Sequence, residues 1–171
     1  MKIFFTLEKK VAPFCSTISS LNPILFVFAI SACMLLIECT LALVLVSILG
    51  LPPRSNIDSS HKTVLILVLF IAPLIETFLA QLIPYVVLKA FGIDNKFFLL
   101  FFMASAFVLL HVSAGLTTTL VAGVVGGVFL SYAFLRFSET SLFFAYLITA
   151  CCHFLNNAFV LFVLLLLSEY L

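Results

Sequence analysis

The chain has 171 residues, of which 65% are hydrophobic and 9% are charged, and its formal net charge is +1. A typical globular domain is about 45–50% apolar and about 25% charged. The composition therefore excludes a soluble globular domain and a disordered chain, and the near-neutral charge argues against a nucleic-acid partner. It predicts an all-α, polytopic integral membrane protein, which we expect in the cell (inner) membrane with lipid around its helices.

Five long apolar segments follow one another along the chain, each near the length of about 20 residues that a membrane-spanning helix needs. The first begins after Asn22, a good N-cap residue, and ends at Gly50, which suits a helix C-terminus. We predict a transmembrane helix bundle with spans at about Pro23–Leu49, Thr63–Val87, Lys96–Gly115, Thr119–Phe137 and Ser141–Leu167.

Two of these spans carry residues that change helix geometry or packing. Pro73 in the second span leaves the carbonyl of Leu69 without its usual partner, so we expect a kinked or re-entrant segment there. Gly123 and Gly127 in the fourth span form a small-xxx-small pair, which lets another helix approach closely. We expect this pair to pack inside the bundle, with self-association of two chains as its second use.

Lysine and arginine residues are distributed unevenly between the two sides that five spans define. If the N-terminus is inside, two of them, Arg54 and Lys62, lie outside and six lie inside. Positive residues favour the cytoplasmic side, so we predict a cytoplasmic N-terminus. The six inner residues are Lys2, Lys9, Lys10, Lys89, Lys96 and Arg136.

Polar residues inside the spans stand out, because an ionisable group there costs about 2.5–3.5 kcal/mol to insert and marks a functional site by default. Glu76 follows Pro73 by three residues, where a kink suits a hydrated pocket and a carboxylate can act as a general base on water. His153 and Asn157 are four residues apart, so they share a helix face and can donate to one developing oxyanion. His111 lies at a similar depth in the third span, so we expect all four residues to converge.

A polar side chain inside a span can also have a purely structural role, because buried polar side chains hydrogen-bond neighbouring helices. Two further polar residues of the spans, Glu38 and Asn156, are the ones for which we expect this role. Glu38 either pairs with one of the histidines or sits protonated against a polar neighbour. Asn156 points away from the face that His153 and Asn157 share, and we expect it to bond another helix.

Three short motifs lie on separate spans: ETFLAQ from Glu76, FVLLH from Phe107 and HFLNN from His153. They resemble the Glu-Glu-x-x-x-Arg, Phe-x-x-x-His and His-x-x-x-Asn motifs of the CAAX-protease and bacteriocin-processing (CPBP, or Abi) family of intramembrane peptidases. The resemblance covers roughly residues 66–165. It divides the chain into an N-terminal segment with the first transmembrane helix, residues 1–62, and a peptidase-like core, residues 63–171.

The resemblance implies a glutamate-dependent endopeptidase that cleaves membrane-associated or lipidated peptides and proteins. In that family mechanism Glu76, assisted by His111, activates the attacking water. His153 and Asn157 stabilise the tetrahedral oxyanion. We expect a metal-free reaction without a cofactor, and zinc held by Glu76, His111 and His153 is the alternative.

Three further motif positions receive supporting roles from the resemblance. Phe107 opens the second motif, while Thr77 and Gln81 stand where the family usually has Glu and Arg. If Gln81 replaces the Arg as a hydrogen-bond donor, we expect it to bond Glu76 or a neighbouring helix. A bond to Glu76 requires a distorted helix, because residues five apart on an α-helix differ in direction by about 140°.

The two departures from the motif support a second hypothesis, a catalytically silent relative that binds or protects a membrane partner, as in self-immunity. A small proton-coupled transporter is a third alternative, since Glu and His inside a bundle also build proton relays. A purely structural subunit is the fourth.

Overall fold

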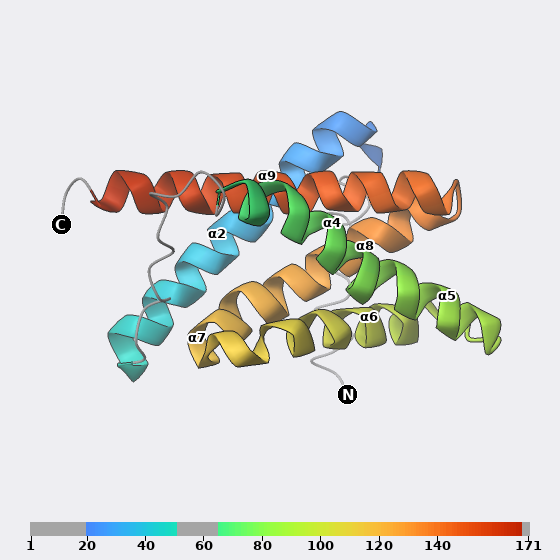
Figure 1. Cartoon of the computed structure of the whole chain (residues 1–171), viewed down its shortest axis with the longest axis horizontal. Coiled ribbons are helices and arrows are strands. Elements are labelled where there is room, and N and C mark those ends of the chain that lie inside the picture. The colour runs from blue at the N-terminus through green and yellow to red at the C-terminus, as the bar shows by residue number, and fades with distance from the viewer. Residues whose placement is uncertain (1–19, 51–64, 169–171) are drawn as a thin grey trace, which may run out of the picture.

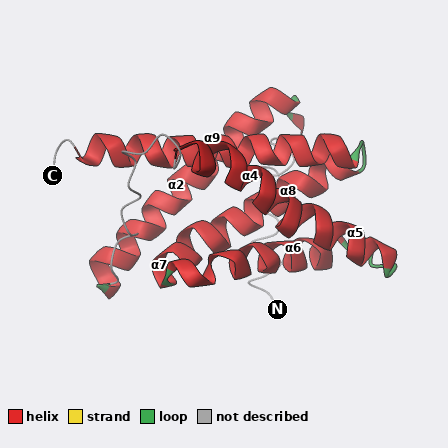
Figure 2. Ribbon diagram, viewed as in Figure 1, coloured by secondary structure: helices red, strands yellow, loops and turns green. Residues whose placement is uncertain are grey.

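The computed structural model of the chain describes residues 20–50 and 65–168, and these residues form helices and no strand (Figure 1, Figure 2). Five helical segments in this part of the chain are long and apolar enough to cross a membrane. The predictions of an all-α bundle with five spans and of a multi-pass membrane protein are thereby confirmed. Five of the residues that carry the orientation prediction, Lys2, Lys9, Lys10, Arg54 and Lys62, lie outside the described residues, so the cytoplasmic N-terminus stays a prediction.

Helix α2 covers Pro23–Leu49, the range that the sequence predicts. Its first turn is capped by Asn22, whose Oδ1 accepts a hydrogen bond from the Leu25 backbone at 3.0 Å. It ends at Gly50, which has a φ of 61°, a left-handed conformation that glycine adopts without steric cost.

The second span alternates between wide π-helical turns and α-helix, as η1 (Leu67–Ile71), α4 (Ala72–Thr77), η2 (Phe78–Leu82) and α5 (Ile83–Ala90). The residue before each of the two prolines, Pro73 and Pro84, forms a backbone hydrogen bond to the residue five positions earlier. Ala72 N–H donates to the Leu67 carbonyl, and Ile83 N–H donates to the Phe78 carbonyl. The missing proline N–H and its ring disturb the i→i−4 pattern, and the wider turns absorb this disturbance. The expected distortion is therefore present as π-helical turns, and the span continues to Ala90 rather than ending at Val87.

The third and fourth spans form a tight antiparallel pair. Helix α6 (Lys96–His111) ends four residues before the predicted Gly115, through a 3₁₀ turn over Val112–Ala114 and a φ of 93° at Gly115. The fourth span then consists of α7 (Leu116–Thr118), η4 (Thr119–Gly126) and α8 (Gly127–Ser138).

The glycines of the fourth span face α6. A Cβ at Gly123 would lie 3.2 Å from His111 Cβ, and one at Gly127 would lie 2.8 Å from the Ala104 carbonyl oxygen. Both glycines are therefore used for packing inside the chain, as expected. Self-association of two chains through them stays a prediction.

The last helix, α9 (Leu142–Ser168), packs against α2, α4 and α8. In Figure 1, α6 and α9 lie on opposite sides of the bundle with α4 and α8 between them. The apolar core fills this space and includes Phe26, Met103, Phe107, Leu130 and Phe134. Large apolar side chains such as Phe97, Phe143 and Phe162 are exposed on the outside, which suits a lipid environment.

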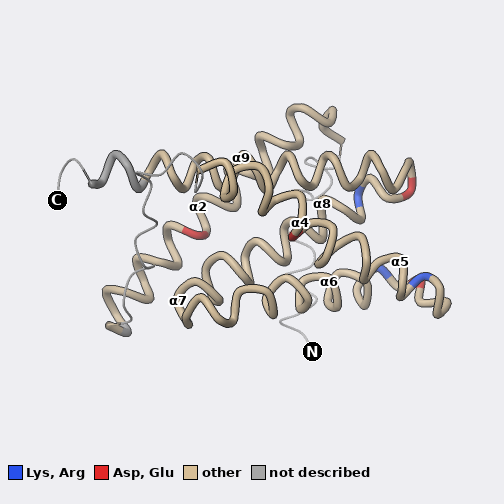
Figure 3. The backbone as a smooth tube through the Cα atoms, in the orientation of Figure 1, with Lys and Arg blue, Asp and Glu red and all other residues tan. Residues whose placement is uncertain are grey.

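Charged residues gather at the end of the bundle where α5 meets α6 and α8 meets α9 (Figure 3). Lys89 pairs there with Asp94, and Lys96 pairs with Glu139 at 2.5 Å. Two acidic residues lie away from this end, Glu38 on α2 and Glu76 on α4. These are the two carboxylates of the described residues that lie within the membrane-spanning part of the bundle, and their presence there needs an explanation.

Candidate active site

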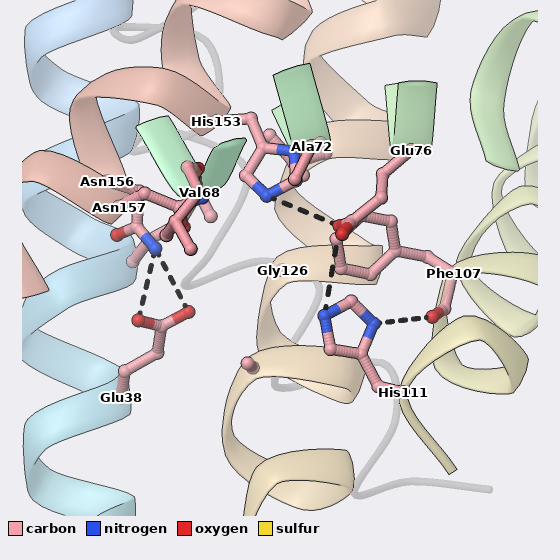
Figure 4. Close-up of a pocket in the computed structure, with 13 residues that line it drawn as sticks. Glu38, Val68, Ala72, Glu76, Phe107, His111, Gly126, His153, Asn156 and Asn157 are labelled. Carbon is pink, nitrogen blue, oxygen red and sulfur yellow. Dashed lines mark hydrogen bonds and ion pairs between the residues drawn. The ribbon is translucent and has the colours of Figure 1, made fainter. Parts of the chain in front are cut away.

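Glu76, His111 and His153 come from three separate spans and meet at one carboxylate oxygen (Figure 4). The Nε2 atom of His111 lies 3.8 Å from Glu76 Oε2, and Nε2 of His153 lies 3.6 Å from the same oxygen. The side chains are 27% exposed for Glu76, 14% for His111 and 5% for His153. The structure thus brings together the three ionisable residues that the sequence selects, in a place largely shielded from solvent.

The local helix geometry explains how Glu76 reaches this place. It lies near the end of the short helix α4, between the two π-helical stretches. Each wide turn changes which residues of the second span face the bundle. As a result Glu76 faces the cavity, while its neighbour Thr77 is fully buried among the helices.

The orientation of His111 is set by the helix that carries it. Its Nδ1 lies 3.0 Å from the Phe107 carbonyl oxygen, so Nδ1 is the atom that carries the proton and donates. In the neutral ring Nε2 then has a lone pair directed towards Glu76 Oε2. Two acceptors facing each other need a hydrogen between them, and a water molecule that donates to one or both supplies it. The geometry therefore suits a water molecule held by a carboxylate and an imidazole.

Phe107 positions both histidine rings. It is buried, stacks on His111 with ring centroids 4.6 Å apart, and meets His153 edge-on at 5.4 Å. Gly126 lies behind it, since a Cβ there would come within 3.0 Å of Phe107 Cε1. Phe107 is thus a wall of the site that holds the imidazoles at their present angle.

The two asparagines of α9 have different partners. Asn157 donates through Nδ2 to the Val68 carbonyl at 3.0 Å, in the first π-helical stretch. Asn156 donates to both carboxylate oxygens of Glu38, at 3.1 and 3.3 Å. The prediction that Asn156 bonds another helix is confirmed, and Asn156 is a polar neighbour of Glu38. The prediction that Asn156 points away from His153 and Asn157 is wrong, because all three residues line one cavity.

Thr77 and Gln81 do not join the ionisable residues. Both are fully buried, and within the described part of the chain neither the Thr77 hydroxyl nor the Gln81 amide has a hydrogen-bond partner. The prediction that Gln81 bonds Glu76 or a neighbouring helix is therefore wrong. The expected distortion is present, but it directs Gln81 and Ala80 into the packed interior.

A cavity of about 110 Å³ joins these groups. Glu38, Glu76, His111, His153, Asn156 and Asn157 line it together with apolar residues. Gly126, Ala122, Val68 and Leu130 belong to the lining but carry no sequence signal, because small and apolar residues are common in every span. They line the cavity only because of the way their helices are oriented in the bundle.

A metal ion in this cavity would need at least three donor side chains around one point. Across residues 20–50 and 65–168, no three His, Cys, Asp or Glu side chains are arranged to hold one. The zinc set of Glu76, His111 and His153 thus finds no support in the donor arrangement, and the metal-free reaction stays a prediction.

No protein-family model, curated protein or solved structure matches this chain. The resemblance to the CPBP family therefore rests on the three sequence motifs.

Proposed function

We propose that the protein is a glutamate-dependent intramembrane endopeptidase that hydrolyses peptide bonds of membrane-associated or lipidated substrates. The observation that carries this proposal is the approach of two imidazole Nε2 atoms, at 3.6 and 3.8 Å, to one oxygen of Glu76 inside a cavity. A carboxylate and an imidazole on either side of one water molecule are the groups that general-base hydrolysis needs.

In the proposed reaction Glu76 takes a proton from the water as its oxygen attacks the carbonyl carbon of the scissile bond. His111, with its proton on Nδ1, orients the water through Nε2. The carbonyl oxygen becomes an oxyanion, and His153 stabilises it when Nε2 carries the proton. The carbon–nitrogen bond then breaks, and the proton on Glu76 passes to the leaving amine.

Asn157 is able to assist this step despite its bond to Val68. An asparagine side chain has two N–H donors, and one hydrogen bond to the Val68 carbonyl leaves the second N–H for the oxyanion. The bond also fixes the amide orientation in the cavity wall. Asn157 is therefore a second oxyanion donor in the proposal.

One observation favours the catalytically silent alternative, in which the protein binds a membrane partner without cleaving it. Where the family motif has a Glu and an Arg, the buried Thr77 and Gln81 are neutral and have no hydrogen-bond partner among the described residues. The charge balance beside Glu76 thus differs from that of the motif. A binding function would use the same cavity without needing that balance.

Cleavage of a lipidated or transmembrane peptide by the purified protein in detergent, read by mass spectrometry, tests the proposal. Glu76→Gln keeps the size of the side chain but cannot accept the proton, so we expect no product from it. Glu139→Gln is the matched control, because it makes the same chemical change at an exposed ion pair outside the cavity. Equal cleavage by the Glu76→Gln and control variants contradicts the proposal, and binding without cleavage by the natural sequence supports the silent alternative.

A further inference from the structure

Small residues form part of the cavity rim beside Glu76. Ala72 precedes Glu76 by four residues in the same helix, α4, so the two side chains share a face one turn apart. Ala122 on η4 also lines the cavity, and both alanines are partly exposed, as are Glu76 and His111. Because alanine side chains are short, the rim leaves room for the main chain of a peptide to approach Glu76.

Large side chains close the cavity on its inner side. Met34 from α2 and Leu130 from α8 line it, and they are 1% and 0% exposed. Phe107 lines it as well and is fixed by the two histidine rings that it contacts. Glu38 and Asn156, bonded to each other, lie on the side opposite Glu76 (Figure 4). A side chain that passes the rim therefore meets packed residues, which limit how far it can extend.

The cavity volume limits how many substrate atoms fit inside. A cavity of about 150 Å³ in another protein holds benzene, a ring of six carbons. At the same packing, the cavity of about 110 Å³ holds about four non-hydrogen atoms. Hydrolysis by a general base places a water oxygen and the carbon and oxygen of the scissile carbonyl beside Glu76. Room is left for about one more atom, the Cβ of the residue that contributes this carbonyl.

We propose that the cavity is a size-selective subsite, which admits glycine or alanine as the residue that contributes the scissile carbonyl. Met34 and Leu130 set the size limit, because they close the inner side. This inference rests on the proposed function, since it assigns a substrate class to the same site. Leucine at this residue would place a branched group against Met34 and Leu130, and a close-packed interior has no space for it unless the helices move.

Peptides that are identical except for glycine, alanine, valine or leucine at this residue test the size limit. Mass spectrometry gives kcat/KM of the natural sequence for each peptide in detergent. Fluorescence anisotropy gives the affinity of each peptide for Glu76→Gln protein, a readout that does not require turnover. We expect the leucine peptide to be cleaved and bound at least about tenfold less well than the alanine peptide, because a single methylene group in an apolar pocket changes discrimination about 10–200-fold.

Substitutions that change the cavity size should move this preference in opposite directions. Met34→Ala shortens a side chain of the inner wall, so we expect it to raise the leucine-to-alanine ratio of kcat/KM about tenfold or more. Met103→Ala is the matched control, because Met103 is equally buried but does not line the cavity. Ala122→Val narrows the partly exposed rim and should lower the alanine-to-glycine ratio, which keeps a test available if Met34→Ala does not fold.

Equal kcat/KM for the alanine and leucine peptides overturns the size limit and leaves the peptidase standing. Ratios that neither Met34→Ala nor Ala122→Val changes, or that Met103→Ala changes as much as Met34→Ala, overturn the assignment of the limit to this cavity. If the natural sequence cleaves none of the peptides but the leucine peptide still binds more weakly than the alanine peptide, the peptidase is contradicted and the subsite stands.

Discussion

Substitution of Gly127 by alanine tests the close contact between α8 and α6. A Cβ at this position would lie 2.8 Å from the Ala104 carbonyl oxygen and 3.3 Å from Ala104 Cα. Both atoms belong to the backbone, so the contact is relieved only if the helices move apart until the shorter distance reaches about 3.4 Å, an ordinary van der Waals separation. Overpacking of this kind costs about 1–3 kcal/mol, while alanine in a helix gains about 0.5–1 kcal/mol over glycine. The middle of the first range, about 2 kcal/mol, less the middle of the second, about 0.75 kcal/mol, gives an expected net loss of about 1 kcal/mol in the free energy of unfolding.

Gly126→Ala is the matched comparison, because it makes the same change in helix propensity one residue away. Its Cβ would meet the Phe107 ring, with Cε1 at 3.0 Å, and a ring can turn where a backbone cannot. Unfolding in detergent by added sodium dodecyl sulfate, followed by circular dichroism, measures both variants. A Gly127→Ala protein as stable as the unsubstituted chain, or more stable than Gly126→Ala, refutes the close backbone contact.

Three further outcomes follow from individual contacts. Thr77→Val should leave the stability unchanged or raise it, because the buried Thr77 hydroxyl has no partner among the described residues; a clear drop in the same unfolding assay contradicts this. The hydrogen bond from Lys96 holds the pKa of Glu139 below its ordinary value of 4.5. Any stability that the natural sequence gains over Glu139→Gln is therefore present above pH 4.5 and is lost as the pH falls through the lowered pKa. An equal difference in stability between the two proteins at pH 7 and pH 3, measured by thermal unfolding, contradicts this. Asn157→Ala should lower kcat/KM about 10²–10³-fold if its second N–H reaches the oxyanion, whereas a loss of stability alone indicates that its bond to the Val68 carbonyl is its whole role.

Local signals in the sequence were sufficient for the helices. The cap residue Asn22 and the left-handed Gly50 defined α2 at both ends, and long apolar runs gave the other spans. Pro73 indicates that the second span is distorted, but a proline permits a kink, a break or a wide turn. The choice of π-helical turns depends on how the span packs against α6 and α9, which the sequence does not display.

The site was harder to predict where a residue depends on distant partners. Glu76 and the two histidines were accessible because an ionisable residue in an apolar span is conspicuous. The direction of the Gln81 side chain is not predictable in this way, because one wide turn rotates every later residue of the span about the helix axis. The bond between Glu38 and Asn156 joins residues 118 positions apart, and no local pattern encodes that register.

The central claim is that Glu76 and His111 act on one water molecule in one cavity, and a double-mutant cycle in kcat/KM tests it most directly. The proteins compared are the unsubstituted chain, Glu76→Gln, His111→Ala and the double variant, with a cleavable membrane peptide as substrate. We expect each single substitution to lower kcat/KM by about 10²–10⁴-fold, and the double variant to be no slower than the slower single variant, because the two groups act as a unit. A double variant whose loss equals the product of the two single losses, or a Glu76→Gln protein with full activity, contradicts the claim.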